Sequence, residues 1–229
     1  MKKIIILLFV LFTLNVSASK PKNSYVKIST SYGDVYIKVI NETPLHRDNF
    51  IKLAKEGTLN GTLFHRVIKN FMIQGGDPDS KTAKAGVLLG DGDLGYTVPA
   101  EFVSNIYHKK GVLAAARDDN PTKASSACQF YIVQGKKYSD AELDALENGR
   151  LAGRKIPADQ REIYKTIGGT PFLDQSYTVY GEVVKGIEMV DKIADVKTDK
   201  NNRPLEDIKM EVVLLKKSAV KKLEKSLSK

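Results

Sequence analysis

The order of apolar and polar residues along the chain predicts a protein built mainly from strands. Residues 25–40 alternate between the two classes on both sides of Ser31-Tyr32-Gly33-Asp34, which is typical of a hairpin. Two further apolar runs, 64–68 and 71–75, are separated by Asn70, a residue common in turns. The same reasoning predicts strands at 111–116, 129–133, 177–184 and 208–215.

Two helices are predicted to pack against these strands. The first begins at Thr43-Pro44, where the threonine hydroxyl is expected to cap the helix and the proline occupies the first turn, and it ends at Gly57. We expect His46 of this helix to lie on the surface. The second helix is predicted at 186–194. The buried face of the first is expected to consist of Leu45, Phe50, Leu53 and Ala54.

The arrangement of these elements indicates the fold class. Strands dominate, the two core helices stand at separated points, and there is no regular alternation of strand and helix. There are no internal repeats. We therefore predict a mainly β fold, a closed antiparallel β-barrel capped by two helices.

The first residues of the chain form an export signal in the prediction. Two lysines follow Met1, the run 4–16 is mostly apolar, and Val16-Ser17-Ala18 offers small residues where a signal peptidase cleaves. A membrane anchor is the alternative, but the run is shorter than the roughly 20 residues of a spanning helix. We expect residues 1–18 to be a cleaved signal, 19–24 a linker, and the protein to be exported to a periplasmic or other extracytoplasmic location. The single cysteine, Cys128, allows no internal disulfide.

Charge changes the picture only at the carboxyl end. The formal net charge is +9, and removal of Lys2 and Lys3 would leave +7. Much of this excess lies in a basic tail, 216–229, where lysines face only Glu224. We expect a solvated, frayed tail. A short amphipathic helix is the alternative, because Val220, Leu223 and Leu227 fall at helical spacing.

Several chemistries are excluded by the residue pattern. The glycine-rich run 86–96 lacks the Gly-Lys-Ser/Thr ending of a phosphate loop, so we interpret it as a surface loop. His46, His65 and His108 are scattered and no cysteine pair exists, which argues against a metal site. The positive charge lacks a basic face studded with aromatic residues, so we expect no nucleic-acid partner. We expect no cofactor, a monomer, and no stable membrane association once the signal is removed.

The stretch from Phe64 to Pro78, FHRVIKNFMIQGGDP, carries the candidate chemistry. Arg66 and Gln74 lie within apolar runs without an acidic residue nearby in the sequence. A guanidinium in such surroundings is either paired with a distant carboxylate or faces a ligand across an apolar pocket.

Two other predicted strands bear on a ligand site. The alanines of the run 111–116 either let the backbone of a ligand approach closely or pack tightly against a neighbouring strand. Alternation in 129–133 places Gln129 and Tyr131 on one face and Phe130 and Ile132 on the other.

These residues resemble the cyclophilin family of peptidyl-prolyl isomerases. The central signature of that family has the form F-H-R, two hydrophobic residues, two variable residues, then F-M-x-Q-G-G-D, and each fixed position is present in 64–77. Two later segments, 111–135 and 172–193, match in the order of the family. The resemblance covers about 25–215 and implies a β-barrel enzyme that accelerates rotation of Xaa-Pro bonds in proline-containing polypeptides.

The resemblance also implies roles for individual residues. Arg66 matches the arginine that favours the twisted amide, with a structural ion pair as the alternative, and Phe71 and Gln74 complete the catalytic set. We expect His65 to be a core histidine bonded to the main chain, not a base, because strand alternation points it away from Arg66. The implied substrate-binding positions are Met72, Ala116, Arg117, Gln129, Tyr131, Phe172, Leu173 and Tyr177.

Residues 138–171 form an insertion, because compact cyclophilins cross this interval in a few residues. Ser139-Asp140-Ala141-Glu142 has the form of a capping box, and Pro157 begins a second helical segment. Long insertions are often functional, and a stabilising lobe is the equal alternative. The apolar positions of the two segments are Leu143, Leu146 and Leu151, then Ile163, Tyr164 and Ile167.

Three positions depart from many eukaryotic members of the family. Phe172 replaces a tryptophan, which removes an indole donor and weakens the expectation of tight cyclosporin binding. Tyr177 replaces a pocket histidine and Tyr131 a phenylalanine, and both keep an aromatic wall. We expect activity with altered peptide preference. A chaperone or docking module that grips proline segments with little turnover is the alternative function.

Overall fold

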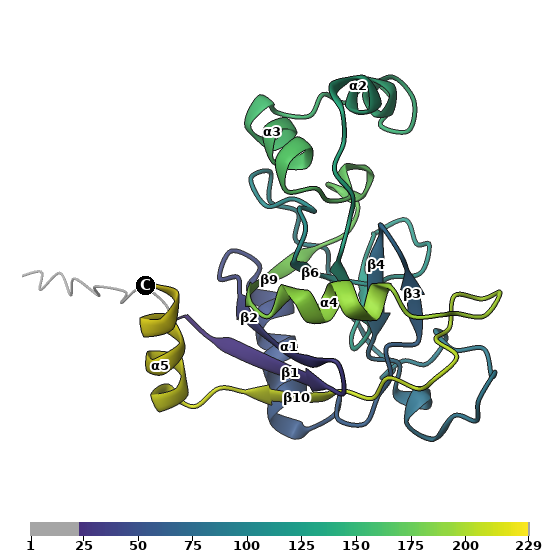
Figure 1. The fold of residues 1–229 in the computed structure, drawn as a ribbon, viewed down its shortest axis with the longest axis vertical. Coiled ribbons are helices and arrows are strands. Elements are labelled where there is room, and N and C mark those ends of the chain that lie inside the picture. Colours follow the sequence, from purple (N-terminus) through teal and green to yellow (C-terminus); the bar gives the residue numbers. More distant parts are fainter. Residues whose placement is uncertain (1–22, 229) are drawn as a thin grey trace, which may run out of the picture.

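A computed structural model describes residues 23–228, so the predicted signal (1–18), most of the linker and Lys229 lie outside the described residues. Strands dominate, as predicted. Eight of them form one antiparallel sheet in the order β10-β1-β2-β9-β6-β8-β4-β3 (Figure 1). A separate pair joins β5 (Thr97–Val98) and β7 (Ser125–Ser126). The strands of the large sheet are β1 (Tyr25–Thr30), β2 (Gly33–Val39), β3 (Arg66–Ile68), β4 (Met72–Gly75), β6 (Val112–Ala115), β8 (Phe130–Val133), β9 (Val179–Lys185) and β10 (Glu211–Leu214).

The prediction of a fully closed barrel is wrong. β3 and β10 are the two ends of the sheet and do not pair with each other as strands. The chain just before β3 contacts the chain just before β10 instead, through an isolated bridge between Leu63 and Lys209 and a bond from the Phe64 amide to the Ile208 carbonyl. The sheet is therefore a strongly curled half-barrel whose last seam is made by irregular backbone.

Two helices, α1 (Pro44–Glu56) and α4 (Ile187–Ala194), bury apolar faces in the main core of the sheet. In α1 this face contains Phe50, Leu53 and Ala54, as predicted, and Phe50 packs edge-on against Phe130 with ring centroids 5.7 Å apart. Leu45 is not part of it, because half of its surface is exposed. The helix ends at Gly57 in the left-handed conformation, with φ of 68°.

The start of α1 differs from the prediction. The Thr43 hydroxyl makes no capping bond; the Glu101 carboxylate accepts the amides of Leu45 and His46, both at 3.0 Å. His46 is buried, not on the surface, because its ring lies between Glu101, 2.7 Å from Nδ1, and Ser125, 3.0 Å from Nε2. Burial lowers the pKa of His46. A loop distant in sequence thus caps this helix and engages its histidine.

The insertion folds into a small helical lobe. It contains α2 (Asp140–Asn148) and α3 (Ala158–Thr166), which Figure 1 shows together at the top of the molecule. The capping box of Ser139 and Glu142 is present, as predicted. The lobe has a core of its own, so its helices are stabilised by burial of apolar side chains within the lobe. Its buried members are Tyr138, Leu143, Leu151, Ile156 and Tyr164.

The carboxyl-terminal segment is helical, so the expected frayed tail is wrong and the amphipathic alternative is correct. Helix α5 (Lys217–Leu227) buries Leu223, and the Tyr25 hydroxyl of β1 donates to Glu224 at 3.1 Å. The lysines of α5 remain exposed. Within residues 23–228, no helix is both long and apolar enough to cross a membrane.

Candidate active site

A hollow of about 270 Å3 opens beside the hairpin of β3 and β4. Its wall combines the apolar groups of Phe71, Met72 and Leu173 with the rings of Tyr131 and Tyr177. Every residue of its lining is one of the positions predicted from the sequence, drawn from segments up to about a hundred residues apart. The full lining is Arg66, Phe71, Met72, Gln74, Ala116, Arg117, Tyr131, Leu173 and Tyr177.

Arg66 stands half-buried in this wall without a carboxylate partner among residues 23–228. Its Nη1 donates to the Gln74 Oε1 at 3.1 Å, because the register of β3 and β4 places the two residues opposite each other. Burial lowers the pKa of Arg66, but an arginine starts so far above neutrality that it stays charged. The alternative of a structural ion pair is therefore wrong in the described structure.

Gln74 is held in turn by Gln129. The Gln74 Nε2 donates to the Gln129 Oε1 at 3.3 Å, and the Gln129 Nε2 donates to the carbonyls of Gly90 and Gly92 at 2.7 and 2.8 Å. Gln129 does not line the hollow. The carbonyls of the glycine-rich loop fix the Gln129 amide, and Gln129 in turn orients Gln74 and so Arg66.

Tyr131 and Tyr177 lie side by side in the wall of the hollow. Their rings meet edge to face with centroids 6.0 Å apart. The Arg117 guanidinium lies 4.7 Å above the Tyr177 ring and donates through Nε to the Ser176 carbonyl at 3.0 Å. These contacts make one wall of the hollow rigid and aromatic.

Phe172 does not line the hollow, although the family resemblance implied that it is a substrate-binding position. Its ring packs on Phe71 with centroids 5.7 Å apart, and the Arg150 guanidinium covers it at 3.8 Å. Arg150 belongs to the insertion, so the lobe occupies the outer side of this position. Phe172 supports Phe71 from outside the hollow.

The alanines of the run 114–116 have different surroundings: Ala114 and Ala115 pack tightly, and only Ala116 lines the hollow. Ala116 lines the hollow, where a small side chain leaves room for a ligand. Ala115 belongs to the main core and Ala114 packs in the cluster behind the hollow, with Tyr131 and Met72.

His65 is buried on the other side of β3, as predicted. Its two ring nitrogens make no hydrogen bond of ordinary geometry within residues 23–228, but the Leu63 main chain acts on the imidazole in the direction that the expected main-chain bond would. Burial is the main cause that lowers the pKa of His65 to about 4, and the neighbouring Arg66 charge acts in the same direction. The imidazole is therefore neutral at pH 7.

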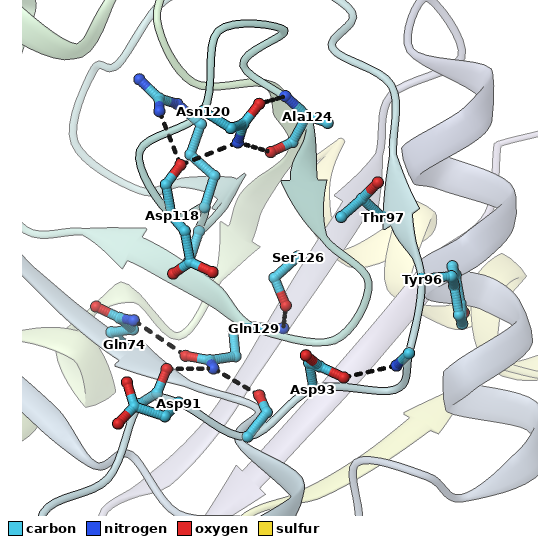
Figure 2. Close-up of a pocket in the computed structure, with 15 residues that line it drawn as sticks. Gln74, Asp91, Asp93, Tyr96, Thr97, Asp118, Asn120, Ala124, Ser126 and Gln129 are labelled. Atoms are coloured by element: carbon cyan, nitrogen blue, oxygen red, sulfur yellow. Dashed lines mark hydrogen bonds between the residues drawn. The ribbon is translucent and has the colours of Figure 1, made fainter.

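A second, more polar pocket of about 430 Å3 adjoins the hollow and shares Gln74, Ala116 and Arg117 with it. Figure 2 shows the side chains of Asp91, Asp93 and Asp118 around this pocket, with the Gln74–Gln129 bond next to Asp91. The glycine-rich loop is at the surface, as predicted, but its part in this pocket was missed. The clue in the sequence was Asp77, the acidic residue at the end of the signature 64–77. Its carboxylate is fully buried and accepts the Gly90 amide at 2.6 Å, so it ties the glycine-rich loop to the end of the signature.

Comparisons with known proteins identify the family of the chain. Residues 25–214 match the family described as "Cyclophilin type peptidyl-prolyl cis-trans isomerase/CLD". A "Putative peptidyl-prolyl cis-trans isomerase" of Staphylococcus aureus (strain USA300) is 35% identical over 189 residues, which are 82% of this chain and 89% of the relative. A protein of the same name from Staphylococcus saprophyticus is 34% identical, over 80% of this chain and 87% of its own length.

Solved structures show the same fold. A cyclophilin type peptidyl-prolyl cis-trans isomerase of Cryptosporidium parvum superposes with a TM-score of 0.60 at 22% identity, covering 85% of this chain and 99% of its own. A second structure of that protein, in the presence of the dipeptide Ala-Pro, gives the same TM-score over 84% of this chain. The chain belongs to the cyclophilin family and is a peptidyl-prolyl cis-trans isomerase.

Proposed function

We propose that this isomerase acts on proline-containing segments of exported proteins, with the proline ring in the hollow and Arg66 as the cation that favours the twisted amide. The observation that carries the proposal is the Arg66 guanidinium, which lines an apolar hollow and has no carboxylate partner in residues 23–228. Rotation about an Xaa-Pro bond breaks no covalent bond. It needs neither a nucleophile nor a metal, only a site that fits the twisted state better than the planar one.

The chemistry follows from the electronic structure of the amide. Conjugation of the nitrogen lone pair with the carbonyl causes the barrier of about 20 kcal/mol. In the twisted state the lone pair returns to the proline nitrogen, which becomes a hydrogen-bond acceptor. A fixed cationic donor stabilises that state more than the planar ones, and the apolar wall holds the ring while the chain on one side turns.

The geometry supports a division of labour among the lining residues. Arg66 is the proposed catalytic residue, and Gln74 holds its guanidinium in place at 3.1 Å. Phe71, Met72, Tyr131 and Leu173 are proposed to contact the proline ring. The main chain at Ala116 and Arg117, which borders both pockets, is proposed to carry the peptide from one to the other.

The second pocket supports a preference among substrates. It contains three carboxylates, whereas the one guanidinium beside them, that of Arg117, is directed to the main-chain oxygens of Ser176 and Asp118. We propose that basic residues near the proline are favoured there. We also propose that the enzyme acts as a monomer, and light scattering of the purified protein tests this.

Isomerisation of a short Ala-Pro peptide, followed by exchange spectroscopy, tests the catalytic role. Arg66→Ala is expected to lower kcat/KM roughly 100-fold or more, as removal of a transition-state donor does. Arg47→Ala removes an arginine that pairs with Asp48 on the surface of α1 and is the matched control. An Arg66→Ala enzyme as fast as the wild type would reject the mechanism. If the wild type isomerises the peptide slowly and the Arg66→Ala variant still binds it, the results would favour the chaperone alternative.

The export part of the proposal is supported by the basic start, the apolar run 4–16 and the small residues before Ser19. Amino-terminal sequencing of the protein recovered outside the cytoplasm is expected to begin at Ser19. Recovery of the full-length chain in the cytoplasmic fraction alone would contradict this. Retention in the membrane fraction after cleavage would contradict the proposed lack of stable membrane association.

A further inference from the structure

A buried chain of four side chains connects the wall of the hollow with the insertion. The Tyr131 hydroxyl lies 2.9 Å from the His108 Nε2, and the His108 Nδ1 lies 2.9 Å from the Asp174 Oδ1. The other oxygen of that carboxylate, Oδ2, accepts the Tyr164 hydroxyl at 2.7 Å. None of the four residues is more than 4% exposed.

Donors and acceptors in this chain can be assigned from the carboxylate. Asp174 offers only acceptors, so the His108 Nδ1 donates to it, as does the His108 amide at 2.8 Å. With the ring proton on Nδ1, the acceptor of the imidazole is Nε2, and we assign the Tyr131 hydroxyl as the donor to that atom. Burial raises the pKa of both tyrosine hydroxyls, which therefore keep their protons. Every polar group of the chain has a partner, which low-dielectric surroundings make costly to remove.

One end of this chain defines the shape of the hollow. The Tyr131 ring lines it, and the bond to His108 anchors that ring by its far end. The His108 ring stacks on Tyr131 with an interplanar angle of 15°. Leu173, another lining residue, directly precedes Asp174. Two sides of the hollow therefore meet at the same carboxylate.

The other end lies in the core of the lobe. Tyr164 of α3 is fully buried and packs edge-on against Tyr107 and Tyr138, with ring centroids 5.6 and 6.5 Å away. Its hydroxyl is the link from this core to Asp174. A shift of α3 would move Asp174, then His108 and the Tyr131 ring.

We propose that Tyr164, Asp174 and His108 are positioning residues through which the insertion fixes the width of the hollow and makes it selective for a pyrrolidine ring over a larger one. This rests on the proposed function of the hollow as the proline site. The insertion is then more than a stabilising lobe, because it sets a property of the reaction through Tyr131.

Tyr164→Phe tests the proposal because it removes one hydroxyl and keeps the ring in the lobe core. We expect kcat/KM for an Ala-Pro peptide to fall roughly three- to tenfold, less than the full worth of a hydrogen bond to a carboxylate, because Tyr164 acts on the hollow only through Asp174 and His108. In the same variant, the ratio of kcat/KM for the proline peptide to kcat/KM for a peptide with the six-membered pipecolic acid is expected to decrease. Tyr131→Phe is expected to have a similar effect, and the double variant to lose less than the product of the two, because both interrupt the same chain.

Ser139→Ala is the matched control. It removes the cap of α2 in the same lobe, and the Ser139 hydroxyl makes its hydrogen bonds with Glu142, not with any of the four residues. We expect it to lower the stability of the lobe and to leave the ring preference unchanged. Equal ring preference in wild type and Tyr164→Phe, or equal changes in Tyr164→Phe and Ser139→Ala, would overturn the proposal.

Two further measurements keep the test decisive. Nitrogen-15 spectra of the wild type are expected to show the His108 proton on Nδ1; a proton on Nε2 alone would overturn the assignment even if Tyr164→Phe fails to fold. Binding of the two peptides, measured by titration, gives the ring preference without turnover. An active Arg66→Ala enzyme would reject the catalytic role of Arg66, whereas an unchanged ring preference in Tyr164→Phe rejects only the inference about the insertion.

Discussion

The Arg66 guanidinium and the Gln74 amide face each other across a hairpin, with the Nη1 of one donating to the Oε1 of the other at 3.1 Å. The side chain that holds the proposed catalytic cation is thus neutral. A carboxylate at the same place would neutralise the guanidinium, whereas the amide fixes its direction and leaves its charge available to a substrate.

Gln74→Ala is therefore expected to lower catalysis without removing the cation. Because a hydrogen bond to a charged group contributes about 1.5–3 kcal/mol, we expect kcat/KM to fall roughly ten- to hundredfold. Gln160→Ala removes another buried glutamine, which lies in the insertion and donates to the Ser104 carbonyl outside it, and serves as the control. Peptide isomerisation rates of the two variants check the prediction. Similar losses in both would show that Gln74 has no special relation to Arg66.

The acidic lining of the second pocket predicts a salt-dependent substrate preference. At low ionic strength, a peptide with lysine near its proline is expected to have a kcat/KM several-fold above that of a peptide with glutamate there. Added salt should reduce this difference, because exposed charges are screened over about 10 Å at 0.1 M salt. Replacing both Asp91 and Asp118 by asparagine should reduce this preference. Asp34→Asn, on β2 away from both pockets, is the control and should leave it intact. A preference that salt does not alter would contradict the electrostatic explanation.

Buried His65 predicts a loss of stability in mild acid. The unfolded chain binds a proton at about pH 6.5, whereas the pKa of His65 in the folded protein is about 4. Above pH 6.5 the imidazole is neutral in both states and the protein keeps its full stability. Below pH 6.5 only the unfolded chain takes up the proton, so the free energy of unfolding falls by up to about 3 kcal/mol as the pH approaches 4. Denaturant unfolding at a series of pH values measures it.

His65→Gln should flatten this pH dependence but not abolish it. Burial also lowers the pKa of His46, which contributes in the same direction. A variant with the same pH profile as the wild type would show that His65 does not carry the effect. Isomerase activity of folded protein is expected to stay level across this range, since Arg66 remains charged.

Glu101 is predicted to stabilise α1 as a cap supplied from outside the helix. Glu101→Ala leaves two amides and the buried His46 ring without their acceptor, so we expect a loss of about 1–3 kcal/mol in the free energy of unfolding. Thr43→Ala, which removes a hydroxyl that makes no capping bond, should cost less. Thermal or denaturant unfolding of both variants compares them. A greater loss in Thr43→Ala would reject this account of the cap.

The sequence by itself determined the strands of the large sheet and the residues of the hollow, whereas the short pair β5 and β7 was not predicted. Alternation in β3, β4 and β8 fixes which side chains share a face, and the register of a short hairpin follows from its turn at Asn70, so Arg66 and Gln74 come together through local rules. The fixed spacing of the signature then brought Phe71 and Met72 to the same wall.

Only the tertiary structure decided the features that depend on distant partners. Glu101 reaches His46 across 55 positions, the half-barrel ends in an irregular seam between 61–64 and 208–210, and Tyr164 meets Asp174 because a separate lobe folds against the hollow. Phe172 lies outside the hollow, in contact with Phe71 and with Arg150 of the insertion. Periodicity reports which face of an element is apolar, but not which segment will pack there, because that choice depends on the burial and hydrogen-bond partners that the whole fold supplies.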